Sequence, residues 1–236
     1  MVMLVRNSYR ATFAVTMAFL FNAGWVDSIV LYNVYNESVT YVTGNFSSVG
    51  DAIATHNIFF MFNIFMLIFG FIGGATVSGI ILRTQNLYFD KTYGWVLILQ
   101  AIFTLIGLLL MNQSGYKVYV YYDLMFLSFA MGMQNATTSI YSGGLARTTH
   151  LTGTTTDFGI HLGRWMARKA YDGRKLFFYF SSMIMFAVGS AAGAFWSHHS
   201  DHNYLYLLLP SILIPLAYGV YYIFFNERSR KRRFAS

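Results

Sequence analysis

Six long stretches with few or no charged residues limit what this chain can fold into. Each is at least eighteen residues long, and an α-helix of that length, rising about 1.5 Å per residue, can cross most of a roughly 30 Å hydrocarbon core. Only 11% of the residues are charged, whereas soluble domains contain about one quarter. We therefore expect an all-α, polytopic transmembrane helical bundle, with residues 1–236 as a single membrane domain. The stretches are residues 11–34, 58–82, 94–111, 118–141, 176–197 and 204–225.

The distribution of basic residues predicts which way the helices run. If the N-terminus lies inside and the chain crosses six times, fifteen basic residues fall on inner segments and only Lys117 falls outside. This bias predicts cytoplasmic N- and C-termini, with residues 226–236 as a basic cytoplasmic tail. Eight crossings would give thirteen against three, so the charges favour six crossings and leave eight as the alternative.

The formal net charge of +7 raises the question of nucleic-acid binding. Five of the basic residues directly follow the last apolar stretch, where the ordinary role of such residues is to anchor a protein on anionic lipid. We therefore expect the lipid bilayer as a partner and no nucleic acid.

Two further segments, residues 35–57 and 142–175, are expected to enter the membrane without crossing it. Their apolar runs are short and contain polar residues, and segments of this kind are more often re-entrant than spanning. We predict two half-helices that dip in from opposite faces. The interrupting polar residues are Asp51, His56, Asp157, His161 and Arg164.

An internal repeat relates the two halves of the chain at an offset of 108 or 109 residues. The shared pattern is a glycine-containing helix, then the motif TxxTG, then another glycine. Repeat one covers about residues 11–112 and repeat two about 119–225. Three crossings per repeat is an odd number, so the repeats are expected to be inverted, as in many secondary transporters. The corresponding positions are 24–27 with 132–135, 40–44 with 149–153, Gly50 with Gly159, and Gly70 and Gly74 with Gly189 and Gly193.

The same residues resemble a known family. The GWVD run at 24–27, the TGN at 43–45, the GMQN at 132–135 and the TTHLTG at 148–153 are similar to the YoaK-like family, a domain-of-unknown-function family. The resemblance extends over roughly residues 11–225. It implies a multi-pass protein of the bacterial cytoplasmic (inner) membrane, and it supplies no solute.

Each TxxTG motif is expected to lie where a loop turns into a half-helix. Glycine would allow a tight turn, and the neighbouring hydroxyl or amide groups would cap free backbone N–H groups. Two helix N-termini, each with partial positive charge, would then meet near the midplane and bind an anion or a polar solute. The alternative is that each motif only caps its own helix. The expected substrate-binding residues are Asp27, Thr43, Gly44, Asn45, Gln134, Asn135, Thr152, Gly153 and Thr154.

Several of these residues have two interpretations that the sequence leaves open. Asp27, inside the first span, could carry a proton or could be hydrogen-bonded to the TGN turn. Its repeat partner is Asn135, which cannot titrate, so proton coupling would involve one repeat only. Asp157 and His161 share a helix face and could form a proton relay or gate with Asp27, or the polar face of an interfacial helix. Gln134 could contact a ligand or hold helices together.

These features predict a secondary transporter, with proton coupling as one option, or a channel for a small polar or anionic solute. The alternative is a membrane scaffold or accessory subunit with a filled interior. The chain has no Walker loop, HExxH or GxSxG motif, so we expect neither an enzyme nor a catalytic residue. It has no cysteine, and its histidine-rich loop around residues 198–202 lacks metal-ligand spacing, so no metal or cofactor is expected. Monomer and homo-oligomer both remain open.

Overall fold

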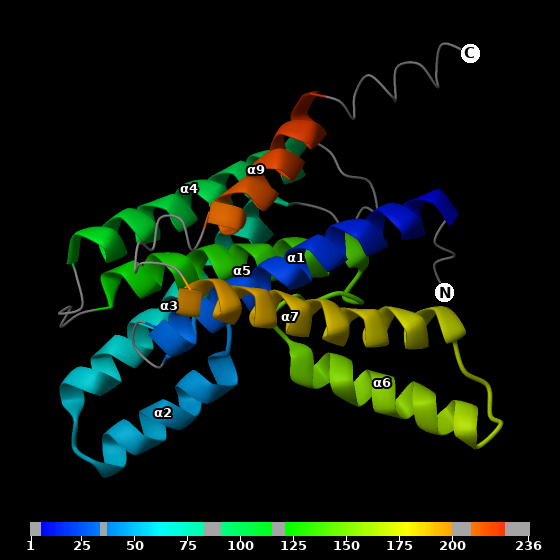
Figure 1. Cartoon of the computed structure of the whole chain (residues 1–236), viewed down its shortest axis with the longest axis horizontal. Coiled ribbons are helices and arrows are strands. Elements are labelled where there is room, and N and C mark those ends of the chain that lie inside the picture. The colour runs from blue at the N-terminus through cyan, green and yellow to red at the C-terminus, as the bar shows by residue number, and fades with distance from the viewer. Residues whose placement is uncertain (1–5, 34–36, 83–90, 115–120, 200–208, 225–236) are drawn as a thin grey trace.

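The expected all-helical architecture is confirmed by the structure, a computed structural model that describes residues 6–33, 37–82, 91–114, 121–199 and 209–224. Within these ranges the chain forms eight helices and no strand (Figure 1). They are α1 (Arg6–Asn33), α2 (Val42–Ala54), α3 (Ile58–Ile81), α4 (Lys91–Ser114), α5 (Tyr122–Ser142), α6 (Leu151–Met166), α7 (Gly173–His199) and α9 (Leu209–Phe224). Each of the six apolar stretches overlaps with one of the helices α1, α3, α4, α5, α7 and α9 over most of its length. The basic tail, Lys117, Asp201 and His202 lie outside the described residues.

Four of the described helices are long and apolar enough to cross a membrane. The qualifying stretches are Thr12–Leu31 in α1, Ile58–Ile81 in α3, Lys91–Asn112 in α4 and Gly173–His199 in α7. The shorter α9 is also apolar. Helices of this length and composition indicate a membrane protein.

The two segments expected to be re-entrant are both helical. α2 has 13 residues and α6 has 16, so at about 1.5 Å per residue they are roughly 20 Å and 24 Å long. Each is shorter than a hydrocarbon core of about 30 Å. Both begin near the middle of the molecule and run outward to opposite ends (Figure 1).

The helices pack across the repeats. α1 and α5, the first helices of the two repeats, run in opposite directions (Figure 1). α1 packs mainly on α7 and α5 packs on α3, so the first helix of each repeat lies against a later helix of the other. α4 packs on α5 and α9, while α2 and α6 lie on α3 and α7. The repeats are therefore intertwined and do not form two separate bundles.

Glycines allow the close approach at both of these crossings. A Cβ on Gly74 would lie 1.9 Å from the carbonyl oxygen of Phe129, and a Cβ on Gly189 would lie 2.1 Å from that of Phe21. Phe21 and Phe129 are 108 positions apart, which is the repeat offset of α1 and α5. Gly74 therefore corresponds to Gly189, and its expected match with Gly193 is wrong by one helical turn. The reason is that glycines four residues apart give two nearly equivalent alignments on one helix face.

Candidate functional site

A cavity of about 530 Å³ lies where α2 and α6 begin. This volume is within the range of small-molecule sites. The wall consists of Asp27, Thr40, Tyr41, Val42, Thr43, Phe71, Ala75, Asn135, Ala136, Ser139, Arg147, Thr149, His150, Leu151, Thr152 and Phe186. These residues come from both repeats, so the cavity lies at the interface between them.

Most of the wall consists of residues that the repeat relates to one another. The pairs are Asp27 with Asn135, Thr40 with Thr149, Tyr41 with His150, Val42 with Leu151, Thr43 with Thr152, and Phe71 with Phe186. The first five pairs follow the offset of 108 or 109, and the two phenylalanines follow the 115-residue offset of Gly74 and Gly189. Residues paired in this way are related by a pseudo-two-fold axis between the repeats. In transporters with inverted repeats, the solute usually binds at the interface that this axis passes through.

Asp27 fixes the chain before α2 and also lines the cavity. Its Oδ1 accepts hydrogen bonds from the hydroxyls of Ser38 and Thr40, the latter at 2.7 Å. Ser38 Oγ in turn accepts the backbone N–H groups of Thr40 and Tyr41, at 3.1 and 2.8 Å. Asp27 is therefore hydrogen-bonded, but to Ser38 and Thr40, which precede the TGN turn to which the sequence suggested a bond, and it remains on the cavity wall.

Asn135 occupies the equivalent position in repeat two. Its Oδ1 accepts the backbone N–H of Thr149 at 3.2 Å. The first threonine of each TxxTG motif is thus tied to a polar residue on the first helix of its own repeat. This contact explains why the motif and the GWVD or GMQN run recur together.

The glycine of each TxxTG motif makes room for a ring. A Cβ on Gly44 would lie 2.2 Å from Cδ1 of Tyr41, and a Cβ on Gly153 would lie 2.5 Å from Cδ2 of His150. Tyr41 and His150 are the residues that precede α2 and α6. Each ring therefore folds over the first turn of its helix, at the edge of the cavity.

Two expectations about the motif are wrong. Neither glycine has positive φ, and both lie inside the first turn of a helix rather than in a tight turn. The preceding residues, Tyr41 and His150, make no side-chain cap hydrogen bond. The hydroxyl of Thr154 donates backward to the carbonyl of His150 at 3.2 Å, and the amide of Asn45 donates to the carbonyl of Ser38 at 3.1 Å. These groups satisfy carbonyls and leave the helix N-termini without side-chain caps of the expected kind.

The electrostatics of the cavity favour an anion at one end. The first N–H groups of an α-helix have no acceptor within the helix, and the N-terminus carries partial positive charge. Two such N-termini, those of α2 and α6, lie at the cavity, together with the guanidinium-bearing Arg147. Asp27 is the only carboxylate among the lining residues.

Of the nine expected substrate-binding residues, four line the cavity and five lie beside it. The lining residues are Asp27, Thr43, Asn135 and Thr152, and those beside it are Gly44, Asn45, Gln134, Gly153 and Thr154. Asp157 and His161 lie farther along α6. Tyr179 on α7 has a side-chain hydrogen bond with Asp157, and its ring centroid is 5.8 Å from that of His161. These two residues therefore contribute to the contact between α6 and α7.

Gln134 is the centre of a buried amide network behind the cavity. Its Oε1 accepts from Asn22 Nδ2 at 2.7 Å and from Gln100 Nε2 at 3.0 Å. Its Nε2 donates to the carbonyl of Phe19 at 2.9 Å and to Thr148 Oγ1 at 3.2 Å. The amide thus links α1, α4 and the segment before α6, and the arrangement favours packing over ligand contact.

Several wall residues were not among the expected site residues, and of these Arg147 and His150 carry the most chemistry. His150 belongs to the second TxxTG motif and could have been found there, because its repeat mate Tyr41 is also a ring. Arg147 was assigned to an inner segment by counting charges. Its repeat mate is Ser38, so the repeat gave no signal for it. Among the described residues no group of three His, Cys, Asp or Glu side chains could hold a metal ion.

Comparison with known proteins identifies the family of the chain. A search of curated proteins and a search of solved structures each found no match. The sequence model of DUF1275, a family described as a protein of unknown function, matches residues 15–220. This range includes both TxxTG motifs and every residue of the cavity wall. YoaK-like proteins are members of the same family, which confirms the resemblance noted above. The chain therefore belongs to the DUF1275 family.

Proposed function

We propose that the chain is a secondary transporter that carries a small polar or anionic solute through the cavity between its repeats. The observation that carries this proposal is the meeting of two oppositely directed short helices at a cavity lined by repeat-related residues. Half-helix N-termini that converge at the interface of inverted repeats form the substrate sites of several transporter folds. The location we propose is the bacterial cytoplasmic membrane, with both termini inside.

Arg147 and the two helix N-termini supply the binding groups in this proposal. Thr43 and Thr152, the repeat-related threonines in the first turns of α2 and α6, add hydroxyls on the wall. Asp27 is the group that would take up a proton if transport is proton-coupled. Because Asn135 replaces it in repeat two, such coupling would depend on repeat one alone.

The cavity also weighs against the second candidate function. A scaffold or accessory subunit would be expected to have a filled interior, whereas a space of about 530 Å³ remains between the repeats. In addition, the wall includes Arg147, and charged residues inside membrane proteins usually serve a ligand or face water. The proposal assigns no catalytic role to any residue.

Flux into proteoliposomes tests the proposal. The purified chain is reconstituted and supplied with labelled monocarboxylates, dicarboxylates, amino acids, sugars and inorganic anions. We expect saturable uptake of at least one solute, and its loss in Arg147→Gln. The matched control is Arg164→Gln, which removes a positive charge from the exposed far end of α6. If the folded protein neither binds nor carries any solute of the panel, the proposal is wrong.

A further inference from the structure

The cavity wall holds two opposite charges that do not pair with each other. Asp27 contributes a carboxylate from α1, and Arg147 contributes a guanidinium from the segment before α6. The hydrogen bonds to Asp27 come from the hydroxyls of Ser38 and Thr40. Neither charged side chain has an ion pair in the part of the chain that the structure describes. Asp27, which is partly buried, and Arg147, which is exposed, therefore both belong to the cavity wall, and neither has a charged partner among the described residues.

These charges come from different repeats. The repeat mate of Asp27 is the neutral Asn135, and the repeat mate of Arg147 is the neutral Ser38. Repeat one thus supplies the negative charge and repeat two the positive charge. The charge distribution of the cavity is therefore asymmetric, although most of the remaining wall consists of repeat-related residues.

A solute with a single charge would compensate only one side of such a cavity. A simple anion would be attracted by Arg147 and repelled by the carboxylate of Asp27, and a simple cation would meet the reverse. At a site with lower dielectric than water, both the attraction and the repulsion are stronger than in solution. A molecule that carries both charges can interact favourably with Asp27 and Arg147 at the same time.

The wall also contains apolar side chains beside its polar ones. Phe71 and Phe186, related by the repeat, and Val42 and Leu151, also so related, line the same cavity. An apolar segment of the solute between its charged ends would therefore contact side chains of matching polarity.

We propose, on the basis of the transport function above, that the solute is a small zwitterion whose carboxylate faces Arg147 and whose ammonium faces Asp27. The carboxylate also lies toward the N-terminus of α6, which adds partial positive charge at that end. The ammonium takes the place of a cationic partner for Asp27. The class includes amino acids, and the separation of the two charges in the preferred solute reports the distance across the cavity.

Binding to a matched set of solutes tests this assignment. The probes are leucine, the unbranched ω-amino acids from glycine to 6-aminohexanoate, and the matching carboxylates and amines that lack one charged group. Dissociation constants are measured by calorimetry on the purified protein in nanodiscs. We expect at least one zwitterion to bind tenfold or more tightly than both of its single-charge analogues.

Two variants assign the charges to their residues. Asp27→Asn keeps an oxygen for Ser38 and Thr40, as Asn135 does for the backbone N–H of Thr149, so the fold should be retained. This variant should lose the preference for the zwitterion over the carboxylate, while Arg147→Gln should lose the preference over the amine. Asp51→Asn on α2 and Arg164→Gln on α6, which remove charges from exposed positions outside the cavity wall, should leave both preferences unchanged.

The outcomes separate this inference from the proposed function. If a carboxylate without an ammonium binds as tightly as its zwitterion, the solute class is wrong and transport of an anion remains supported. If the preference for the zwitterion persists in both charge variants, the assignment to Asp27 and Arg147 is overturned. If no probe of any class binds to the folded protein, both the solute class and the proposed function fail.

Discussion

The side chains of Tyr41 and His150 show how one small residue can control a binding site. Each ring rests on the space left by the glycine three positions later, in the first turn of α2 or α6. Because both rings belong to the cavity wall, the glycines shape the cavity without touching a solute. This role differs from the tight turn that the sequence suggested, and it can be tested separately.

Gly44→Ala and Gly153→Ala should weaken solute binding while leaving the fold intact. The new methyl group would displace the ring of Tyr41 or His150, and both side chains are exposed enough to swing away. We expect binding to weaken about tenfold and the free energy of unfolding to change by less than about 1 kcal/mol, or roughly 2–4 °C in melting temperature. Calorimetry and thermal unfolding measure the two effects.

The matched controls lie on the same two helices as the variants. Gly50 and Gly159 are related by the repeat and lie on α2 and α6, where an added Cβ would meet nothing within 4 Å. Alanine at these positions should leave binding unchanged and add helix stability of up to about 1 kcal/mol. Wild-type affinity in Gly44→Ala would show that the ring position does not matter.

Glu37, in the segment between α1 and α2, should make stability depend on pH. Burial raises the pKa of Glu37 above its ordinary value. The pKa of Tyr121 is also raised, by burial and by the nearby negative charges of Glu37 and Asp123. A carboxyl whose pKa is higher in the folded state than in the unfolded state destabilises the fold once it ionises. Stability should therefore fall as the pH rises from about 4 toward 7, through the ordinary and then the folded pKa.

Glu37→Gln should remove this loss of stability. We expect the variant to melt at a higher temperature than the wild type at pH 7, and at the same temperature below about pH 3, where the wild-type carboxyl is protonated in both states. Asp51→Asn, which removes a charge from an exposed side chain, is the control and should show no such pH-dependent difference in melting temperature. A difference that is constant over the whole pH range would rule out the proton-linked explanation.

At the scale of the helices, the backbone crossings should tolerate change much less than the cavity rim. At Gly74 and Gly132 on one crossing, and at Gly24 and Gly189 on the other, the atom closest to an added Cβ is a carbonyl oxygen at 1.9–2.2 Å. A carbonyl within a helix cannot swing away as a side chain does, so the two helices would have to separate. Overpacking of this kind usually costs about 1–3 kcal/mol, and more where backbone must move.

Alanine at each of these four glycines should therefore destabilise the protein by about 3 kcal/mol or more. The equivalent variants in the two crossings should have similar effects, because the same contact occurs in both. Gly79→Ala on α3, where nothing lies within 4 Å, is the control. Thermal unfolding of the purified variants in detergent measures the effect. Equal melting temperatures for Gly74→Ala and Gly79→Ala would contradict the close approach.

The helices themselves could be predicted because their signal is local. Long apolar stretches give helices in a membrane whatever their partners are, and each expected stretch largely coincides with one of α1, α3, α4, α5, α7 and α9. The first-turn interactions could not be predicted in this way. TxxTG fits a capped helix start as well as a ring packed on glycine, and the choice depends on Asp27 and Asn135, which lie more than twelve residues earlier in the sequence.

At the scale of the whole molecule, the repeat was visible in the sequence but its packing was not. An inverted repeat is compatible with two separate three-helix units and with units that exchange helices. The contacts of α1 with α7 and of α5 with α3 show the second arrangement. The sequence also did not show the position of Arg147, which was expected only to lie in an inner segment. The segment after α5 turns at Gly143 and Gly144, both with positive φ, before α6 begins, and Arg147 in that segment lines the cavity.

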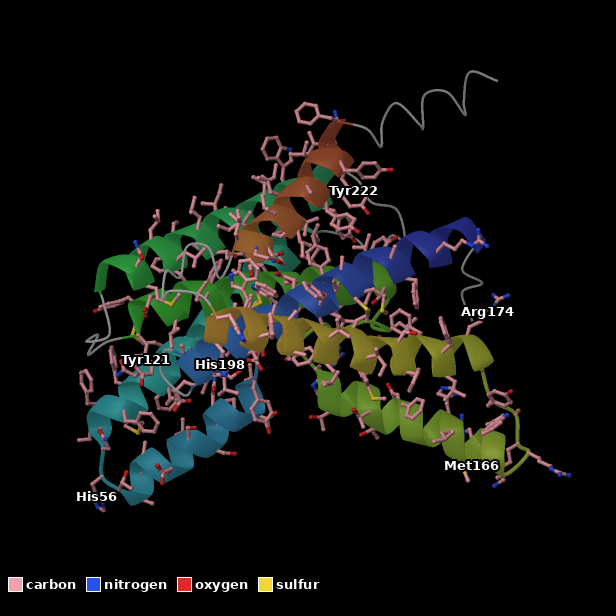
Figure 2. The ribbon with its side chains drawn as sticks, in the orientation of Figure 1. His56, Tyr121, Met166, Arg174, His198 and Tyr222 are labelled. Carbon is pink, nitrogen blue, oxygen red and sulfur yellow. The ribbon has the colours of Figure 1, made fainter. Side chains whose placement is uncertain are left out.

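The opposite directions of α2 and α6 lead to a test of the orientation of the entire chain. Figure 2 shows His56, just after α2, and Met166, at the end of α6, at opposite ends of the molecule, with Arg174 near the Met166 end. If the molecule crosses the membrane along this direction, the α2–α3 and α6–α7 connections face opposite compartments. By the positive-inside rule, the exposed basic residues of the α6–α7 connection predict that this end faces the cytoplasm.

The absence of cysteine allows single-cysteine labelling on an otherwise native sequence. Ala54→Cys at the end of α2 and Ala170→Cys between α6 and α7 are matched exposed positions. In intact cells an impermeant maleimide should label Ala54→Cys, and it should label Ala170→Cys only after the membrane is opened. Ile64→Cys, at a fully buried position, should stay unlabelled in both conditions until the protein is denatured. Labelling of both alanine positions from one side would overturn the inverted arrangement. If Ala170→Cys is labelled in intact cells and Ala54→Cys only after the membrane is opened, the repeats are still inverted but the orientation is reversed. The geometry of the repeats requires only that the two connections face different sides. The basic residues alone predict which connection faces the cytoplasm.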